Sequence, residues 1–217
     1  DPYTNLKIDK SVSKIKARNI FGKVDHVVKN GSSPDLKIID INVEERATGE
    51  ISAGAGIGTN GGSFAVNVKE NNWLGEGNSI GFDLEFDQDT IKGELSFTNP
   101  NHDLLGNSLN YRVFSTSNDK PDQGFQNSLV GASIGTSFEQ YKDVYTSLSL
   151  SASYDDLRTD SSASASLQKQ KGEFSEIAGT YGITYDQRNR AFMPTDGTII
   201  KFRQSLPIYA DKPFIGN

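Results

Sequence analysis

From Thr48 onward the chain is built of about nine segments in which apolar and polar residues alternate, separated by turns rich in Gly, Asn, Asp and Pro. In the clearest segment, residues 79–87 with the sequence SIGFDLEFD, every second residue is a large apolar one. A period of two residues places all the apolar side chains on one face of a β-strand. We find no helical period in this part of the chain, so the sequence predicts a mainly β, antiparallel fold.

Two features favour a transmembrane β-barrel over a soluble β-sandwich, whose strands are also half apolar. The segments are near ten residues long, which suits a tilted membrane strand of about 9–11 residues better than a sandwich strand of about five or six. Charged residues such as Glu85, Lys92 and Arg203 also lie inside the strands, as a water-filled lumen allows. Nine strands are few and odd in number for a bacterial barrel, so we expect the chain to stop before the barrel closes.

The composition limits the chemistry available to the chain. It contains no Cys, which excludes disulfides, thiolate metal sites and Cys nucleophiles. Its 22 Lys and Arg against 28 Asp and Glu give a net charge of −6, which argues against nucleic acid as the main partner. His26 and His102 have no nucleophile elbow beside them. Residues 56–61 match the G-x-G-x-x-G pattern, but an alternating segment follows where a dinucleotide site needs a helix. We therefore expect no enzyme activity, no metal and no cofactor.

The first 46 residues have a different pattern. It predicts a helix capped at Thr4 or Asn5, with apolar residues recurring every three or four positions. Two strands, over residues 24–29 and 36–43, follow and are joined by a turn-rich segment. One helix and one hairpin are too few to enclose a core of their own. We therefore interpret residues 1–46 as the C-terminal part of a larger α/β domain.

Four short motifs carry more information than their composition. Residues 48–58, TGEISAGAGIG, form a strand with Gly at every second position of one face. Residues 71–77, NNWLGEG, form a tight turn that contains the only Trp. Asn99-Pro100 ends one predicted strand, and residues 194–197, PTDG, precede another.

In these motifs, which occur in order and at nearly even spacing, the chain resembles the barrel-assembly family of outer-membrane insertases, the BamA-type assembly factors. That family carries a G-x-G-x-G first strand, an N-F/W-L-G-x-G turn after strand two, T-N-P after strand four and P-T-D-G before strand nine. The resemblance covers essentially the whole chain. It implies that residues 1–46 end the last periplasmic POTRA domain and that residues 47–217 form about nine of sixteen barrel strands. The implied location is the outer membrane of a Gram-negative bacterium.

The resemblance also implies where the activity lies. A seam formed by the glycine-rich first strand would open, and its unpaired backbone groups would then capture a strand of an unfolded client. The residues of this lateral-gate strand are Glu50, Ile51, Ser52, Ala53, Gly54, Ala55, Gly56, Ile57 and Gly58. The family turn motifs comprise Asn72, Trp73, Leu74, Gly75, Gly77, Asn99, Pro100, Pro194, Thr195, Asp196 and Gly197.

The function that follows is the folding and insertion of β-barrel proteins without cofactor or ATP. The expected partners are outer-membrane lipid, unfolded outer-membrane protein clients and accessory assembly lipoproteins. Three alternatives share parts of the pattern: a related translocation or secretion barrel of the TamA or two-partner type, a passive porin-like channel, and a soluble β-sandwich binding module.

Overall fold

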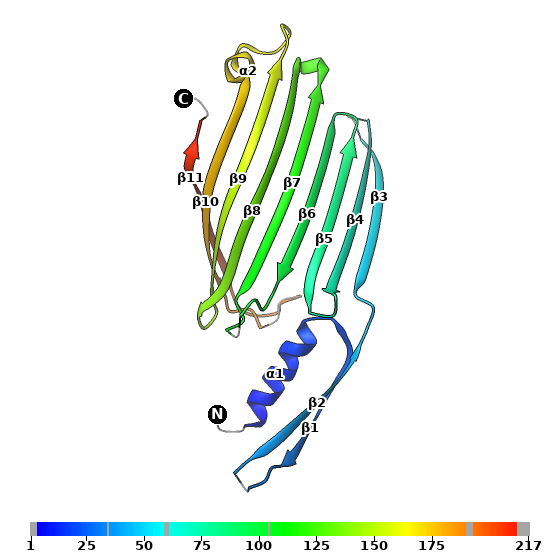
Figure 1. The fold of residues 1–217 in the computed structure, drawn as a ribbon, viewed down its shortest axis with the longest axis vertical. Coiled ribbons are helices and arrows are strands. Elements are labelled where there is room, and N and C mark those ends of the chain that lie inside the picture. The colour runs from blue at the N-terminus through cyan, green and yellow to red at the C-terminus, as the bar shows by residue number, and fades with distance from the viewer. Residues whose placement is uncertain (1–3, 34, 59–60, 104, 190–192, 212–217) are drawn as a thin grey trace.

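The computed structural model describes residues 4–33, 35–58, 61–103, 105–189 and 193–211 of the 217-residue chain. A nine-stranded antiparallel sheet forms most of the molecule, and a smaller helix–hairpin unit lies at one end of it (Figure 1). The sheet is curved but open, with β3 and β11 as its two outer strands. The mainly β, antiparallel prediction is therefore confirmed.

The helix–hairpin unit consists of α1 (Asn5–Ala17), β1 (Phe21–Asn30) and β2 (Lys37–Glu45). Thr4 caps α1, as predicted, because its hydroxyl accepts from the Lys7 backbone N–H at 3.3 Å. Ile8, Val12 and Val24 form the buried core between the helix and the hairpin. β1 extends beyond its predicted limits at both ends and β2 beyond its predicted C-terminal end, and Pro34 of the segment between them lies outside the described residues.

Each strand of the sheet pairs with its neighbours in sequence, so the sheet is a continuous meander. Its strands are β3 (Gly49–Gly58), β4 (Gly61–Trp73), β5 (Asn78–Asp87), β6 (Thr90–Asn99), β7 (Ser108–Lys120), β8 (Phe125–Tyr141), β9 (Val144–Thr159), β10 (Gly172–Asp186) and β11 (Ile199–Ala210). β3 and β4 are consecutive antiparallel strands that pair up to Gly58 opposite Gly61, so the glycine-rich stretch 56–61 leads from strand to strand and not into a helix; residues 59–60 lie outside the described part.

The prediction that no helix follows Thr48 is wrong. A 3-10 turn, η1 (Pro121–Gln123), joins β7 to β8, and a short helix, α2 (Ala165–Gln170), lies in the connection between β9 and β10. At six residues, α2 is too short to show a helical period in the sequence. The helices described by the structure are all too short or too polar to cross a membrane.

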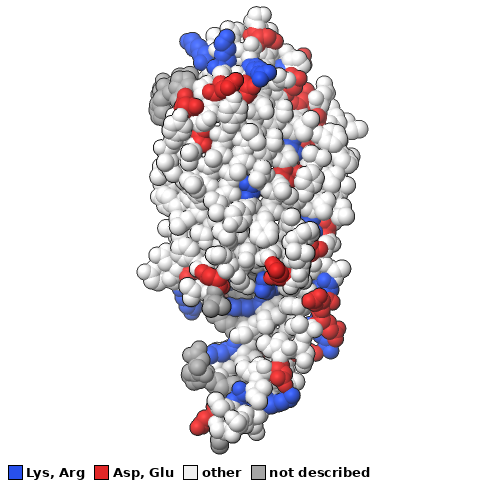
Figure 2. All heavy atoms as spheres, in the orientation of Figure 1, with Lys and Arg blue, Asp and Glu red and all other residues white. Residues whose placement is uncertain are grey.

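The strand register separates two faces. On the apolar face, Phe82 lies opposite Leu95, and Leu95 lies opposite Val113. Leu95 is 50% exposed and Val113 53%, and no second described layer covers them. Most of the sheet in Figure 2 is accordingly uncharged, and charged residues gather near its two ends. A soluble monomer rarely exposes so large an apolar surface, so the arrangement differs from the β-sandwich alternative.

The polar face carries the charged residues predicted inside the strands. Arg112 pairs with Glu94 at 3.3 Å, and Lys92 pairs with Glu85 at 3.5 Å. These residues border a hollow of about 380 Å³ on the same face. Because the pairs are half exposed, they add little to stability, but they keep charge on one side of the sheet.

Candidate functional site

The outer edge of β3 is the first candidate. β3 pairs with β4 along its whole length, from Gly49 opposite Glu70 to Gly58 opposite Gly61. No strand among the described residues pairs with its other edge, and all ten β3 residues are exposed. The backbone N–H and C=O groups of such an edge are available to pair with another strand.

Side chains contribute little to holding β3 in place. A methyl group added at Gly54 or Gly58 would meet no atom within 4 Å. Ile51 is 79% exposed and Ile57 is 94% exposed. Every residue predicted for the gate strand therefore lies in one bare edge strand, held mainly by its backbone bonds to β4.

The N-terminal end of β3, unlike the rest of the strand, is held by side-chain hydrogen bonds. Thr48, the buried residue just before the strand, donates through its hydroxyl to the Glu70 carboxylate. Asn71 Nδ2 donates to the Thr48 carbonyl at 3.2 Å, and the Asn72 backbone N–H donates to Glu70 Oε1 at 2.7 Å. We call these four residues the foot network, because they fix the point where the sheet begins.

The predicted turn after β4 is present. Its Gly75 N–H donates to the Asn72 carbonyl at 2.9 Å, and its Gly77 N–H donates to Asn72 Oδ1 at 2.7 Å. Leu74 and Gly77 have positive φ angles of 57° and 71°, a conformation that favours glycine at position 77. Trp73, the last residue of β4, is 43% exposed.

Arg18 joins this turn to a second one. From the end of α1, its Nη2 donates to the Gly77 carbonyl at 3.3 Å. In the amide orientation that satisfies both its polar atoms, Asn101 accepts from Arg18 Nη1 at 3.1 Å and donates to the Pro100 carbonyl at 3.0 Å. The Asn72–Gly77 turn and Asn101, the residue after the Asn99–Pro100 motif, thus meet at one guanidinium. The role of Arg18 has no signal in the local sequence, because its partners lie so far along the chain.

The loop that presents Asn101 is fixed by Asp103. Its Oδ1 accepts from the Asn107 backbone N–H at 3.0 Å and from the Leu105 N–H at 2.9 Å. These bonds, the one from Asn107 first, hold the pKa of the Asp103 carboxyl below its usual value.

The PTDG motif lies elsewhere. It forms part of the β10–β11 connection, where Asn189 Nδ2 donates to Thr195 Oγ1 at 2.9 Å and the Gly197 N–H donates to Asp196 Oδ1 at 2.8 Å. Since β11 and β3 are the opposite edges of the sheet, Pro194–Gly197 belong to a different connection from the hairpin of the gate strand.

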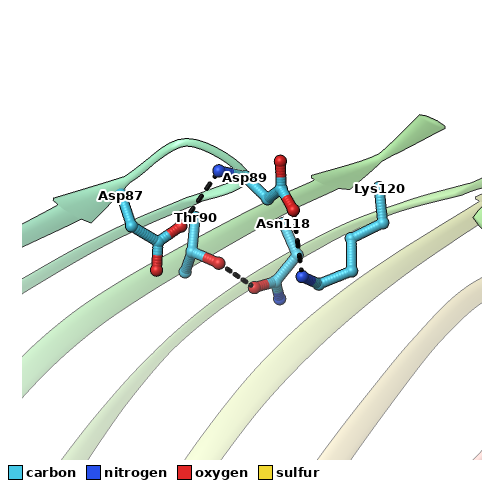
Figure 3. Close-up of polar contacts among 5 residues, drawn as sticks. All are labelled: Asp87, Asp89, Thr90, Asn118 and Lys120. Carbon is cyan, nitrogen blue, oxygen red and sulfur yellow. Dashed lines mark hydrogen bonds and ion pairs between the residues drawn. The ribbon is translucent and has the colours of Figure 1, made fainter. Parts of the chain in front are cut away.

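A polar cluster closes the other end of the sheet, at the β5–β6 turn (Figure 3). The Asp89 N–H donates to Asp87 Oδ1 at 2.9 Å, and Lys120 pairs with Asp89 at 3.2 Å. Thr90 Oγ1 donates to Asn118 Oδ1 at 3.1 Å. These carboxylates are engaged in the turn and its ion pair, which gives the cluster a structural role.

Comparison with known proteins places this geometry in context. Residues 72–214 match the Omp85 superfamily domain. The chain is 27% identical over 143 residues to "Outer membrane protein assembly factor BamA" of Neisseria meningitidis serogroup B, covering 65% of this chain and 17% of that protein. It is 23% identical over 186 residues to "Sorting and assembly machinery component 50 homolog" of Bos taurus, covering 85% of this chain and 38% of that protein.

The crystal structure of BamA from Haemophilus ducreyi lacking POTRA domains 1–3 has the same fold, with a TM-score of 0.72 at 22% identity, over 93% of this chain and 42% of that chain. The chain thus spans less than half the length of each of these relatives. The matched superfamily domain begins at residue 72, so the POTRA assignment of residues 1–46 and the roles of residues 50–58 stay predictions.

Proposed function

Because the chain belongs to the Omp85 superfamily, we propose that it folds β-barrel proteins and inserts them into the outer membrane of a Gram-negative bacterium. The observation that carries the proposal is β3 itself, a glycine-rich outer strand of the described sheet that is held to β4 with little side-chain packing. The names of two relatives, an outer-membrane assembly factor and a sorting and assembly component, support the same activity.

The mechanism follows from the cost of unpaired backbone in lipid. A client segment that enters hydrocarbon must satisfy its N–H and C=O groups, and lipid cannot supply partners. The edge of β3 offers such partners one strand at a time, so the client gains its hydrogen bonds before it leaves for the bilayer. Backbone pairing alone drives this step, so it needs no metal, cofactor, ATP or catalytic residue.

The placement of the protein follows from its two faces. The apolar face would contact outer-membrane lipid, and the polar face, with Arg112 and Glu94, would line the lumen. Residues 1–46, as the end of a POTRA domain, would lie in the periplasm and residues 47–217 in the membrane. Accessory assembly lipoproteins would then bind on the periplasmic side.

Site-directed crosslinking tests the proposal. Residues 1–217 contain no Cys, so single Cys variants at Ser52, Ala55 and Ile57, in full-length protein with any Cys outside this range replaced, report on β3 alone. A client carrying one Cys in its last strand should crosslink to these positions during insertion. Ser133, in β8 with paired strands on both sides, is the matched control. Crosslinking no stronger than at Ser133 would exclude β3 as the client site.

The same reconstituted protein separates the alternatives. Conductance without any acceleration of client folding would indicate a passive channel. Passage of a soluble passenger chain across the bilayer, without insertion of barrel clients, would indicate a secretion barrel.

A further inference from the structure

The contact between Arg18 and the β4–β5 turn continues to the gate strand without a break. Arg18 donates to the Gly77 carbonyl, and the Gly77 N–H donates to the Asn72 side chain. The Asn72 N–H donates to Glu70, which accepts from Thr48 at the start of β3. A chain of hydrogen bonds therefore runs from the helix–hairpin unit, through the turn, into the foot network.

Part of this junction is buried. The described part of the chain has eleven residues with less than about a tenth of their surface exposed, and Ile20, Thr48, Gly77 and Asn78 of the junction are among them. On the unit's own side, Arg46 fixes the segment after α1 by two bonds, from its backbone N–H to the Ile20 carbonyl at 3.4 Å and from Nε to the Asn19 carbonyl at 3.1 Å. A displacement of the unit would therefore strain the junction directly.

The Arg18 guanidinium lies very close to the backbone of the β4–β5 turn. A Cβ added at Gly77 would lie 2.5 Å from Arg18 Nη2, so the glycine allows this close approach as well as the positive φ. Arg18 uses two different nitrogens on two acceptors, the Gly77 carbonyl and the Asn101 amide oxygen. A lysine ammonium has no planar fork to hold both.

The foot network also holds the side-chain hydrogen bonds that anchor the start of β3. Asn71 Nδ2 reaches Glu50 at 3.4 Å, and beyond Glu50 the strand has only Ser52 as a polar side chain. The rest of β3 depends on its backbone ladder with β4. A change at the foot therefore alters the side-chain anchor of the strand, and the upper part has no anchor that would compensate.

We propose that Arg18 is a positioning residue that couples the helix–hairpin unit to the pairing of β3. While Arg18 is hydrogen-bonded to Gly77 and Asn101, the foot network holds β3 against β4. When the unit moves and Arg18 leaves, the foot loosens and the strand pairs more readily along its outer edge. The inference rests on the proposed function, because it regulates the strand that would receive the client.

Amide hydrogen exchange in the full-length protein, reconstituted in lipid, tests the coupling without any client. Arg18→Ala should raise the exchange of the β3 amides by about tenfold, the order expected for losing a hydrogen bond from a charged donor. Lys16→Ala, which removes the same charge from an exposed position of α1, should leave β3 unchanged. Exchange in α1 reports whether the unit itself stays folded in each variant.

A second variant removes one acceptor of the Arg18 guanidinium without altering the helix–hairpin unit. Asn101 lies in the β6–β7 loop, and the strands β4, β5 and β6 separate that loop from β3. Asn101→Ala should still raise β3 exchange, and it should add nothing in the Arg18→Ala background, because both changes break one linkage. Unchanged β3 exchange in Arg18→Ala and Asn101→Ala, or simple addition of their effects, would overturn the coupling.

Client crosslinking then separates this inference from the proposed function. Raised β3 exchange together with faster crosslinking at Ser52 and Ile57 supports both. Raised exchange with no crosslinking at β3 in any variant supports the coupling and overturns the proposed client site.

Discussion

Gly131 lies directly opposite Phe114 in the β7–β8 pair, and the Phe114 ring occupies the space in which a side chain at position 131 would stand. A methyl group there would lie 2.5 Å from Phe114 Cζ and 2.9 Å from the Ala152 carbonyl oxygen. The guanidinium of Arg112 lies 4.8 Å from the centre of the same ring. Glycine, aromatic ring and cation thus lie next to one another on the polar face, and the glycine leaves the space that the ring occupies.

Replacing that glycine should destabilise the sheet. Gly131→Ala should lower the free energy of unfolding by about 1–3 kcal/mol, because the methyl group overlaps both the ring and a backbone carbonyl. Urea titration in detergent micelles measures the change. Gly93→Ala is the matched control, since a methyl group at position 93 meets no atom within 4 Å. Equal losses in the two variants would show that backbone conformation, and not the Phe114 contact, sets the requirement at position 131.

The core of the helix–hairpin unit predicts a second effect. With so few buried residues, the loss of one should matter: Ile8→Ala should cost about 2–5 kcal/mol and unfold the unit while the sheet stays intact. Amide exchange in α1, compared with exchange in β8, measures the two parts separately. Leu6→Ala changes a residue of the same helix that is 80% exposed, and its cost should stay within about 0.5 kcal/mol. Loss of protection in β8 as well would mean that the unit and the sheet unfold together.

The strands could be predicted from the sequence because their signal is local. In residues 79–87 the apolar period fixes the strand and its two faces, and the structure has β5 over Asn78–Asp87. Strand length was harder to predict. β8 has 17 residues, whereas each alternating segment was expected to have about ten. The helix α2 was not predicted, because its six residues are too few to show a helical period.

The candidate site was predicted only in part. The motifs at 72–77 and 99–100 identified turns, as found, because glycine and asparagine mark left-handed and side-chain-capped turns. The meeting of the 72–77 turn and Asn101 at Arg18 was not predictable, since 59 residues separate Arg18 from Gly77 and no periodic pattern connects them. Contacts of this kind depend on how two units pack, which the local sequence does not encode.

Asp103 predicts a pH dependence. The N–H donors led by that of Asn107 bind the ionised carboxylate, so its pKa in the folded loop is lower than its ordinary value of about 3.9. The bonds therefore stabilise the loop fully above that ordinary value, and the stabilisation is lost as the pH falls through the lowered pKa. Exchange of the Asn107 amide should rise only in strongly acid solution. Asp103→Asn should raise it at neutral pH and remove its acid dependence; an unaltered pH profile in that variant would assign the transition to another group.

Trp73 makes the orientation of the sheet measurable. It is the only Trp of the chain, and it ends β4 opposite Asn78, which has the parity of Ile80 and so belongs to the apolar face. Aromatic side chains of this kind collect at the boundary between lipid headgroups and hydrocarbon. If the apolar face contacts lipid, the fluorescence of Trp73 should therefore respond to the depth of a quencher in the bilayer.

In reconstituted full-length protein with Trp73 as its single Trp, we expect lipids brominated near the headgroup to quench the fluorescence more strongly than lipids brominated at the chain end. The control combines Trp73→Phe with Leu129→Trp. Leu129 lies opposite Asp155 on the polar face, so a Trp there should be quenched at neither depth. Strong quenching at position 129 with little at Trp73 would mean that the polar face meets the lipid. The apolar face would then need a protein partner, and the proposal that it faces lipid while the polar face lines the lumen would be wrong.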